Sequence, residues 1–136
     1  MLPLKYAPHW RVASIALMVA VMLATLTPAV WFWPDRAQFV NWVGGVDKWA
    51  HLLTFLVLTA WFCGLYRRQY YWRIALGLFV FGSLIELAQR WVGYRSGDFL
   101  DLLADVIGII AGLGVAMAGV GGWSQWVESW IVKRKN

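Results

Sequence analysis

Long apolar runs alternate with short polar connections along the chain, and this alternation predicts helices that cross a membrane. Four runs are about twenty residues long, the length that an α-helix needs to span the hydrocarbon core of a bilayer. They lie at about residues 11–30, 47–66, 72–91 and 99–120. We therefore expect an all-α integral membrane protein, with a bundle of four transmembrane helices in a single domain over residues 1–136.

The first apolar run follows a short polar lead and Arg11, which is also the outline of a secretory signal peptide. The run is longer than the usual signal core of about 7–15 residues, and it lacks a small-residue cleavage site. We interpret it as the first transmembrane helix and expect it to end at Thr27 and Pro28.

The last segment has a different pattern. Between about residues 123 and 132, tryptophan, valine and isoleucine fall on one helical face, while serine, glutamine and glutamate fall on the other. Three basic residues follow this segment. The pattern predicts a C-terminal amphipathic interfacial helix that lies on the membrane.

The composition agrees with a membrane location. Apolar residues make up 61% of the chain and charged residues 14%, whereas soluble proteins average roughly 45–50% and 25%. Cys63 is the only cysteine, so a disulfide framework within the chain is excluded. The net charge of +5 comes from short basic clusters between apolar runs, which are typical of topology signals and not of nucleic-acid binding.

These basic clusters also predict the orientation of the helices. The N-terminal segment, the connection between the second and third runs and the C-terminal tail, each counted with the adjoining helix ends, together carry eight Lys and Arg residues, and the opposite side carries four. Because cytoplasmic segments are enriched in Lys and Arg, we expect a multi-pass protein with both termini in the cytoplasm.

Polar side chains concentrate at three helix ends on the opposite, extracytoplasmic side. They stand at the start of the second helix, at the end of the third and at the start of the fourth, on one face in each case. These residues are Lys48, His51, Glu86, Gln89, Asp98, Asp101 and Asp105. Ionisable groups within a membrane are costly and mark functional sites, so we expect them to share one polar pocket.

Four residues near this cluster have expected structural roles. Asp47 and Asp98 precede predicted helices and suit N-caps, and Asp98 with Asp101 resembles a capping box. Gly108 and Gly112 form a G-x-x-x-G step, which allows membrane helices to approach closely.

The ordered set of polar residues resembles the VanZ-like family of small bacterial membrane proteins. That family is named for a component that gives low-level resistance to the glycopeptide antibiotic teicoplanin. Its pattern is Asp-Lys-x-x-His, then Glu-x-x-Gln, a downstream Arg and Asp-x-x-Asp-x-x-x-Asn-x-x-Gly, and the resemblance covers about residues 10–120. The matching residues are Asp47, Lys48, His51, Glu86, Gln89, Arg95, Asp98, Asp101 and Gly108. Asp105 departs from the pattern, because the family usually has Asn there. The resemblance implies a protein of the bacterial cell envelope, placed in the inner (cytoplasmic) membrane.

One hypothesis for the cluster is an enzyme that acts on a lipid-linked or phosphate-bearing envelope molecule. Asp98, Asp101 and Asp105 would hold a divalent cation through carboxylate oxygens. His51 and Glu86 would serve as acid and base, so that the candidate catalytic residues are His51, Glu86, Asp101 and Asp105.

The candidate substrate-binding residues are Lys48, Gln89 and Arg95, because Lys and Arg pair with anionic head groups. A second hypothesis uses the same residues without catalysis, to bind an amphiphilic lipid or a lipoglycopeptide. In a third, the polar groups form a hydrogen-bond network that holds the helices in register. The residues are compatible with all three, and the expected partners are membrane lipids and a lipid-linked envelope molecule.

Overall fold

The computed structural model describes residues 1–27, 36–92 and 99–134, and for residues 36–47 and Val92 it describes the backbone alone. These residues form helices, and no β-strand occurs among them. The elements are α1 (Ala7–Leu26), α2 (Arg36–Leu65), the 3₁₀-helix η2 (Arg68–Tyr70), α3 (Tyr71–Val92), α4 (Phe99–Val115), the π-helix η3 (Ala116–Val120) and α5 (Trp123–Lys133).

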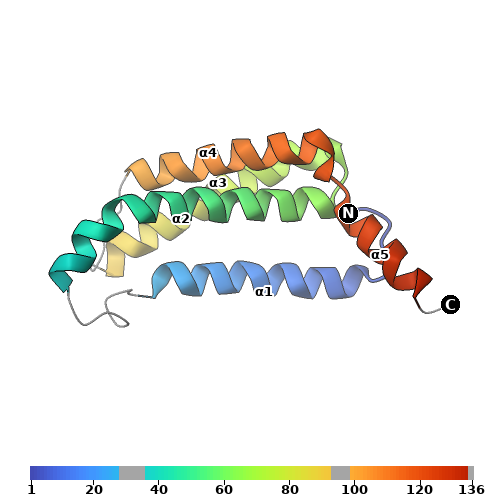
Figure 1. The fold of residues 1–136 in the computed structure, drawn as a ribbon, viewed down its shortest axis with the longest axis horizontal. Coiled ribbons are helices and arrows are strands. Elements are labelled where there is room, and N and C mark those ends of the chain that lie inside the picture. Colours follow the sequence, from blue (N-terminus) through green and yellow to red (C-terminus); the bar gives the residue numbers. More distant parts are fainter. Residues whose placement is uncertain (28–35, 93–98, 135–136) are drawn as a thin grey trace.

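Among the described residues, four helical segments are long and apolar enough to cross a membrane. They cover Ala7–Leu26, Lys48–Leu65, Arg68–Trp91 and Phe99–Val120. This confirms the predicted fold class. In Figure 1, α2, α3 and α4 form one packed group, α1 runs alongside at a greater distance, and α5 lies at the end that carries both termini.

The second helix begins earlier than the sequence pattern indicated. α2 starts at Arg36, so the prediction that Asp47 is its N-cap is wrong. A capping residue precedes the first helical turn, where backbone N–H groups have no intrahelical acceptor. Asp47 lies within the helix instead, and its side chain is outside the described residues.

Glycines allow α4 to pack closely on α2. A Cβ atom at Gly108 would overlap the carbonyl oxygen of Leu52. A Cβ atom at Gly112 would lie 2.6 Å from Cβ of Thr59 and 2.7 Å from the carbonyl oxygen of Leu56. These two residues lie on the face of α4 that meets α2, where larger side chains would separate the helices.

An apolar core lies on α2 one to two turns beyond His51. Phe55 and Leu58 of α2 are buried there against Leu78 of α3 and Ile109 of α4. The same three helices that supply this core also supply the polar cluster, so the packing of the core fixes the relative positions of the polar groups.

α5 is attached to the bundle through its polar face. The chain reaches it through Gly119 and Gly122, whose φ angles of 132° and 81° lie in the left-handed region that favours glycine. In α5, Ser124 is buried and its Oγ donates to the carbonyl oxygen of Gly64 at 2.6 Å. Trp126 and Trp130 on the other face are exposed, as a helix at a membrane interface requires.

Glu128 of α5 binds the segment that leads into α1. Its carboxylate accepts hydrogen bonds from the backbone N–H groups of Lys5 at 2.7 Å and Tyr6 at 2.8 Å, and from Nε1 of Trp10 at 2.9 Å. Burial alone raises the pKa of Glu128, but these donors and the charge of Lys5 outweigh burial and hold the pKa below its ordinary value. The amphipathic pattern indicated a polar face but not this partner.

A buried polar cluster as candidate functional site

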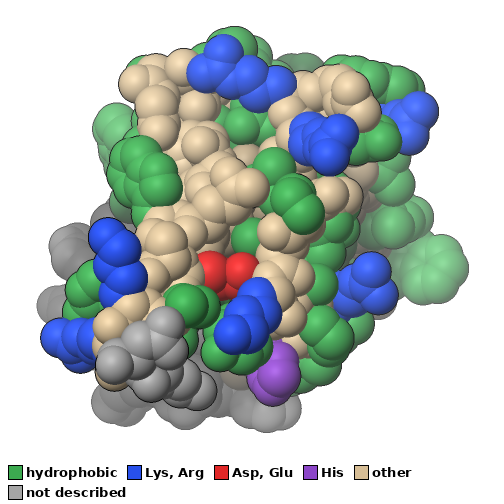
Figure 2. Space-filling model, turned by 90° about the vertical axis from the view of Figure 1, so that its right-hand side faces the viewer, with side chains coloured by type: hydrophobic (Ala, Val, Ile, Leu, Met, Phe, Trp, Pro, Cys, Tyr) green, Lys and Arg blue, Asp and Glu red, His purple; other side chains and the backbone are tan. Residues whose placement is uncertain are grey.

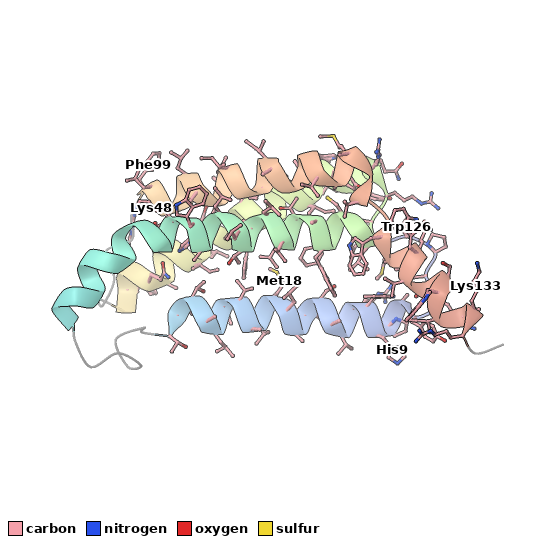
Figure 3. All side chains as sticks on the ribbon, viewed as in Figure 1. His9, Met18, Lys48, Phe99, Trp126 and Lys133 are labelled. Carbon is pink, nitrogen blue, oxygen red and sulfur yellow. The ribbon has the colours of Figure 1, made fainter. Side chains whose placement is uncertain are left out.

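Three helices bring their polar residues together inside the bundle. His51 comes from α2, Glu86 from α3, and Asp101 and Asp105 from α4, and all four are buried. Lys48 lies one turn before His51 on α2 and shows where the four residues lie along the bundle in Figure 3. They are at the end opposite Trp126 and Lys133. The expected convergence of these side chains is therefore present in the structure.

His51 and Asp105 form the shortest contact of the cluster. Nδ1 of His51 donates to Oδ1 of Asp105 at 2.8 Å, and at most 4% of either side chain is exposed. Oδ2 of Asp105 has no hydrogen-bond partner among the described residues. Gly82 of α3 leaves room for this oxygen, because a Cβ atom there would lie 2.6 Å from it.

His51, Glu86 and Asp101 have the geometry of a candidate metal centre. One ligand atom from each lies within 4.8 Å of the other two. Both carboxylate oxygens of Glu86 and Oδ1 of Asp101 are buried without a hydrogen-bond partner in the part of the chain that the structure describes. Buried carboxylate oxygens without hydrogen bonds are costly, and a bound cation would offset this cost.

The sequence spacing explains how α4 contributes two carboxylates. Its buried residues are Asp101, Ala104, Asp105, Gly108, Ile109 and Gly112. Steps of three and four place them on one helical face. The face that packs closely against α2 through its glycines therefore also directs both carboxylates toward His51.

Lys48 and Gln89 lie at the edges of the cluster. Nζ of Lys48 is 3.9 Å from Oδ1 of Asp101, and the Lys48 side chain is 35% exposed. Nε2 of Gln89 donates to the backbone carbonyl of Thr25 at 2.8 Å, so Gln89 joins α3 to α1. Its Oε1 is buried and has no partner among the described residues.

The candidate metal ligands differ from those expected from the sequence. Of the three aspartates predicted to hold a cation, Asp101 belongs to the three-residue group, and Asp105 binds His51 instead. Asp98 and Arg95 lie outside the described residues. The periodicity of one helix predicted ligands from that helix alone, whereas the actual group takes one residue from each of three helices.

Four membrane-spanning segments and a polar cluster buried between three of them define a multi-pass membrane protein with an acid–histidine site. A family model described as VanZ/LLP1 matches residues 5–120, which is most of the chain. The chain belongs to the VanZ/LLP1 family, as its resemblance indicated. No match was found among curated proteins or among solved structures.

Proposed function

We propose that this VanZ-family membrane protein binds a divalent metal ion at His51, Glu86 and Asp101. Through this ion it would hold the anionic head group of an amphiphilic or lipid-linked envelope molecule. The observation that carries the proposal is the convergence of three buried ligand groups. Among them, Glu86 has no hydrogen-bond partner for either oxygen within the described residues.

The donor set favours a transition metal over Mg²⁺ or Ca²⁺. One imidazole nitrogen and two carboxylates suit Zn²⁺, Mn²⁺ or Fe²⁺, whereas Mg²⁺ and Ca²⁺ prefer oxygen ligands alone. Nδ1 of His51 is bonded to Asp105, so Nε2 is the nitrogen left for a metal. A carboxylate on the other ring nitrogen is the usual means of orienting a metal-binding histidine.

Three protein ligands leave a coordination position for a further oxygen, as catalytic metal sites do. An anionic head group would supply that oxygen, and Lys48 supports this by placing positive charge beside Asp101 at the partly exposed edge of the cluster. A bound metal would polarise a phosphoryl or carbonyl oxygen of the head group. Asp105 would hold the His51 imidazole in the orientation that presents Nε2 to the metal.

We place the protein in the bacterial cytoplasmic membrane, with both termini in the cytoplasm and the polar cluster toward the outer leaflet. The distribution of Lys and Arg between the connections supports this orientation. Membership of the VanZ/LLP1 family supports a role in the cell envelope, and the proposal includes the family's link to resistance against teicoplanin.

The first test is the metal content of the detergent-purified protein after incubation with Zn²⁺ or Mn²⁺ and removal of the excess. We expect about one ion per chain in the parent and its loss in Glu86→Gln and Asp101→Asn, with thermal unfolding used to verify that each variant is folded. Glu128→Gln, which removes a carboxylate at the opposite end of the bundle, is the matched control and should retain the ion. Absence of metal from the parent would leave the cluster as a hydrogen-bond network that holds the helices together.

A second test separates catalysis from binding, with a lipid phosphate as the probe. A catalytic role predicts that the metal-loaded parent turns the lipid over, and that His51→Ala, which removes a ligand of the ion, abolishes turnover. A purely binding role predicts that each variant loses function in proportion to its loss of affinity for the lipid, with a large loss for Lys48→Gln.

A further inference from the structure

The end of the bundle opposite the polar cluster contains a second site, which lies between α1 and the α2–α3 pair. We propose that it binds one acyl chain of an anionic phospholipid from the leaflet on the side of the termini, with Arg73 contacting the lipid head group. This site shares no residue with the polar cluster, so the inference goes beyond the proposed function.

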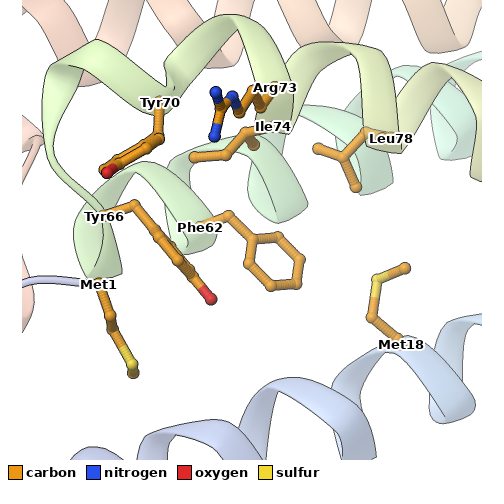
Figure 4. A pocket seen from close by; sticks show the side chains of 9 residues that line it. Met1, Met18, Phe62, Tyr66, Tyr70, Arg73, Ile74 and Leu78 are labelled. Carbon is orange, nitrogen blue, oxygen red and sulfur yellow. The ribbon is translucent and has the colours of Figure 1, made fainter.

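The site is a cavity of about 510 Å³ with a mostly apolar lining. In Figure 4, Phe62 of α2 and Tyr66, the residue after α2, extend toward α1, and Met18 extends from α1 toward them. Leu78 of α3 also lines the cavity. A volume of this size lies within the range of about 300–1,000 Å³ that is usual for ligand sites.

The packing of α1 leaves this cavity open. α1 contains no fully buried residue along its described length, whereas α2, α3 and α4 each contribute several. Gly77 of α3 lines the cavity, and a Cβ atom there would meet nothing within 4 Å among the described residues. A side chain at this position would fit without a clash. The cavity therefore stays open because residue 77 is a glycine and has no side chain.

Arg73 provides positive charge at the mouth of the cavity. Its guanidinium lies 5.3 Å from the ring centre of Tyr70 and 5.2 Å from that of Trp72. Within the described part of the chain no carboxylate forms an ion pair with Arg73. The aromatic rings hold the guanidinium in place while its charge stays available to a phosphate.

Charged and apolar groups follow one another along the cavity in the order found in a phospholipid, whose charged head group is followed by its acyl chains. Arg73 stands at the start of α3, Gly77 follows one turn later, and Met18 lies about 17 Å along α1 from its first residue. Figure 2 shows that lysine and arginine side chains are spread over the face at this end. Basic sites of this kind, next to membrane-spanning helices, attract anionic lipids.

The test is native mass spectrometry of the full chain with phosphatidylglycerol and phosphatidylcholine that carry identical acyl chains. We expect the parent to retain the anionic lipid about fivefold more strongly, the ratio that corresponds to about 1 kcal/mol for one basic residue near a membrane. Arg73→Gln should remove this preference. Arg67→Gln, which removes an exposed charge between α2 and α3 that does not line the cavity, should keep it.

A second pair of variants tests the cavity itself. Gly77→Leu should lower retention of both lipids severalfold because it fills the space. Gly114→Leu, at an exposed glycine of α4 whose added Cβ also meets no described atom within 4 Å, should not. Equal retention of the two lipids by the parent would overturn the inference. So would equal effects of Gly77→Leu and Gly114→Leu, or a preference that survives Arg73→Gln.

Discussion

At the scale of single residues, Glu128 is the side chain that links the two ends of the described chain. Its carboxylate receives three hydrogen bonds, two of them from the backbone that leads into α1. Hydrogen bonds to charged groups contribute roughly 1.5–3 kcal/mol each, more than neutral ones. α5 therefore stabilises the start of α1 as well as lying at the membrane surface.

Replacing Glu128 by Gln should destabilise the protein by about 2 kcal/mol, because the amide loses the negative charge and one acceptor oxygen. Thermal unfolding in detergent would measure the change. Gln125→Ala, an exposed position of the same helix, is the matched control and should have little effect. Equal stability of the two variants would contradict a role for Glu128 in attaching α5.

The same contact should depend on pH. Because the donors lower the folded-state pKa of Glu128, the stabilisation is complete above the ordinary glutamate pKa. It is lost as the pH falls through the lower folded-state value. The difference in melting temperature between the parent and Glu128→Gln should therefore shrink below about pH 4. A difference that is constant down to strongly acidic pH would show that the charge is not responsible.

Asp105 offers a second test at this scale. Asp105→Asn should fold with nearly parental stability, because the amide oxygen still accepts the hydrogen bond from Nδ1 of His51. Asp105→Leu leaves His51 without that acceptor, and a broken buried pair costs about 3–5 kcal/mol. Thermal unfolding of the two variants measures this difference. Two equally destabilised variants would mean that the carboxylate charge itself is required.

At the scale of helices, the contact between α2 and α4 depends on glycine. Gly108→Ala should destabilise the bundle by about 1–3 kcal/mol, because its Cβ would press on the Leu52 backbone, which cannot move aside as a side chain can. Gly114→Ala on the same helix has open space and should be neutral or slightly stabilising. Unfolding in detergent compares the two, and a harmless Gly108→Ala would place the helices farther apart than the structure does.

The helix boundaries show what an apolar pattern can predict. The four spans were predictable because each run has the length and composition that a bilayer requires. The start of α2 was not, because Asp47, which closely follows Gly44 and Gly45, suited an N-cap at the beginning of the apolar run. A glycine within a helix costs only about 1 kcal/mol, and the helix continues through both.

The candidate site was predictable in its residues but not in its pairings. Burial cost and helical spacing indicated that His51, Glu86 and the α4 aspartates would converge. Spacing within a helix does not determine which atoms meet across helices. The packing of α2, α3 and α4 determines these pairings. It places Asp105 against His51, and it brings Glu86 close to His51 and Asp101.

At the scale of the whole molecule, the two ends of the bundle differ in character. One end carries the acid–histidine cluster, and the other carries most of the arginine and lysine residues together with both termini. We expect a green fluorescent protein fused to the C-terminus to fluoresce and an alkaline phosphatase fused there to be inactive. Fusions truncated after residue 95 should give the opposite result. Active phosphatase at the C-terminus would reverse the proposed orientation.

The bond between His51 and Asp105 also bears on how the chain enters the bilayer during synthesis. On insertion scales a charged aspartate in a lone transmembrane helix costs about 2.5–3.5 kcal/mol at the helix centre and less toward its ends. α4 carries Asp101 and Asp105 inside its buried face, so its insertion improves when a polar partner is already in the membrane. α2 leaves the ribosome first and brings His51 with it. The order of segments along the chain thus delivers the helix with the histidine donor before the helix that depends on it.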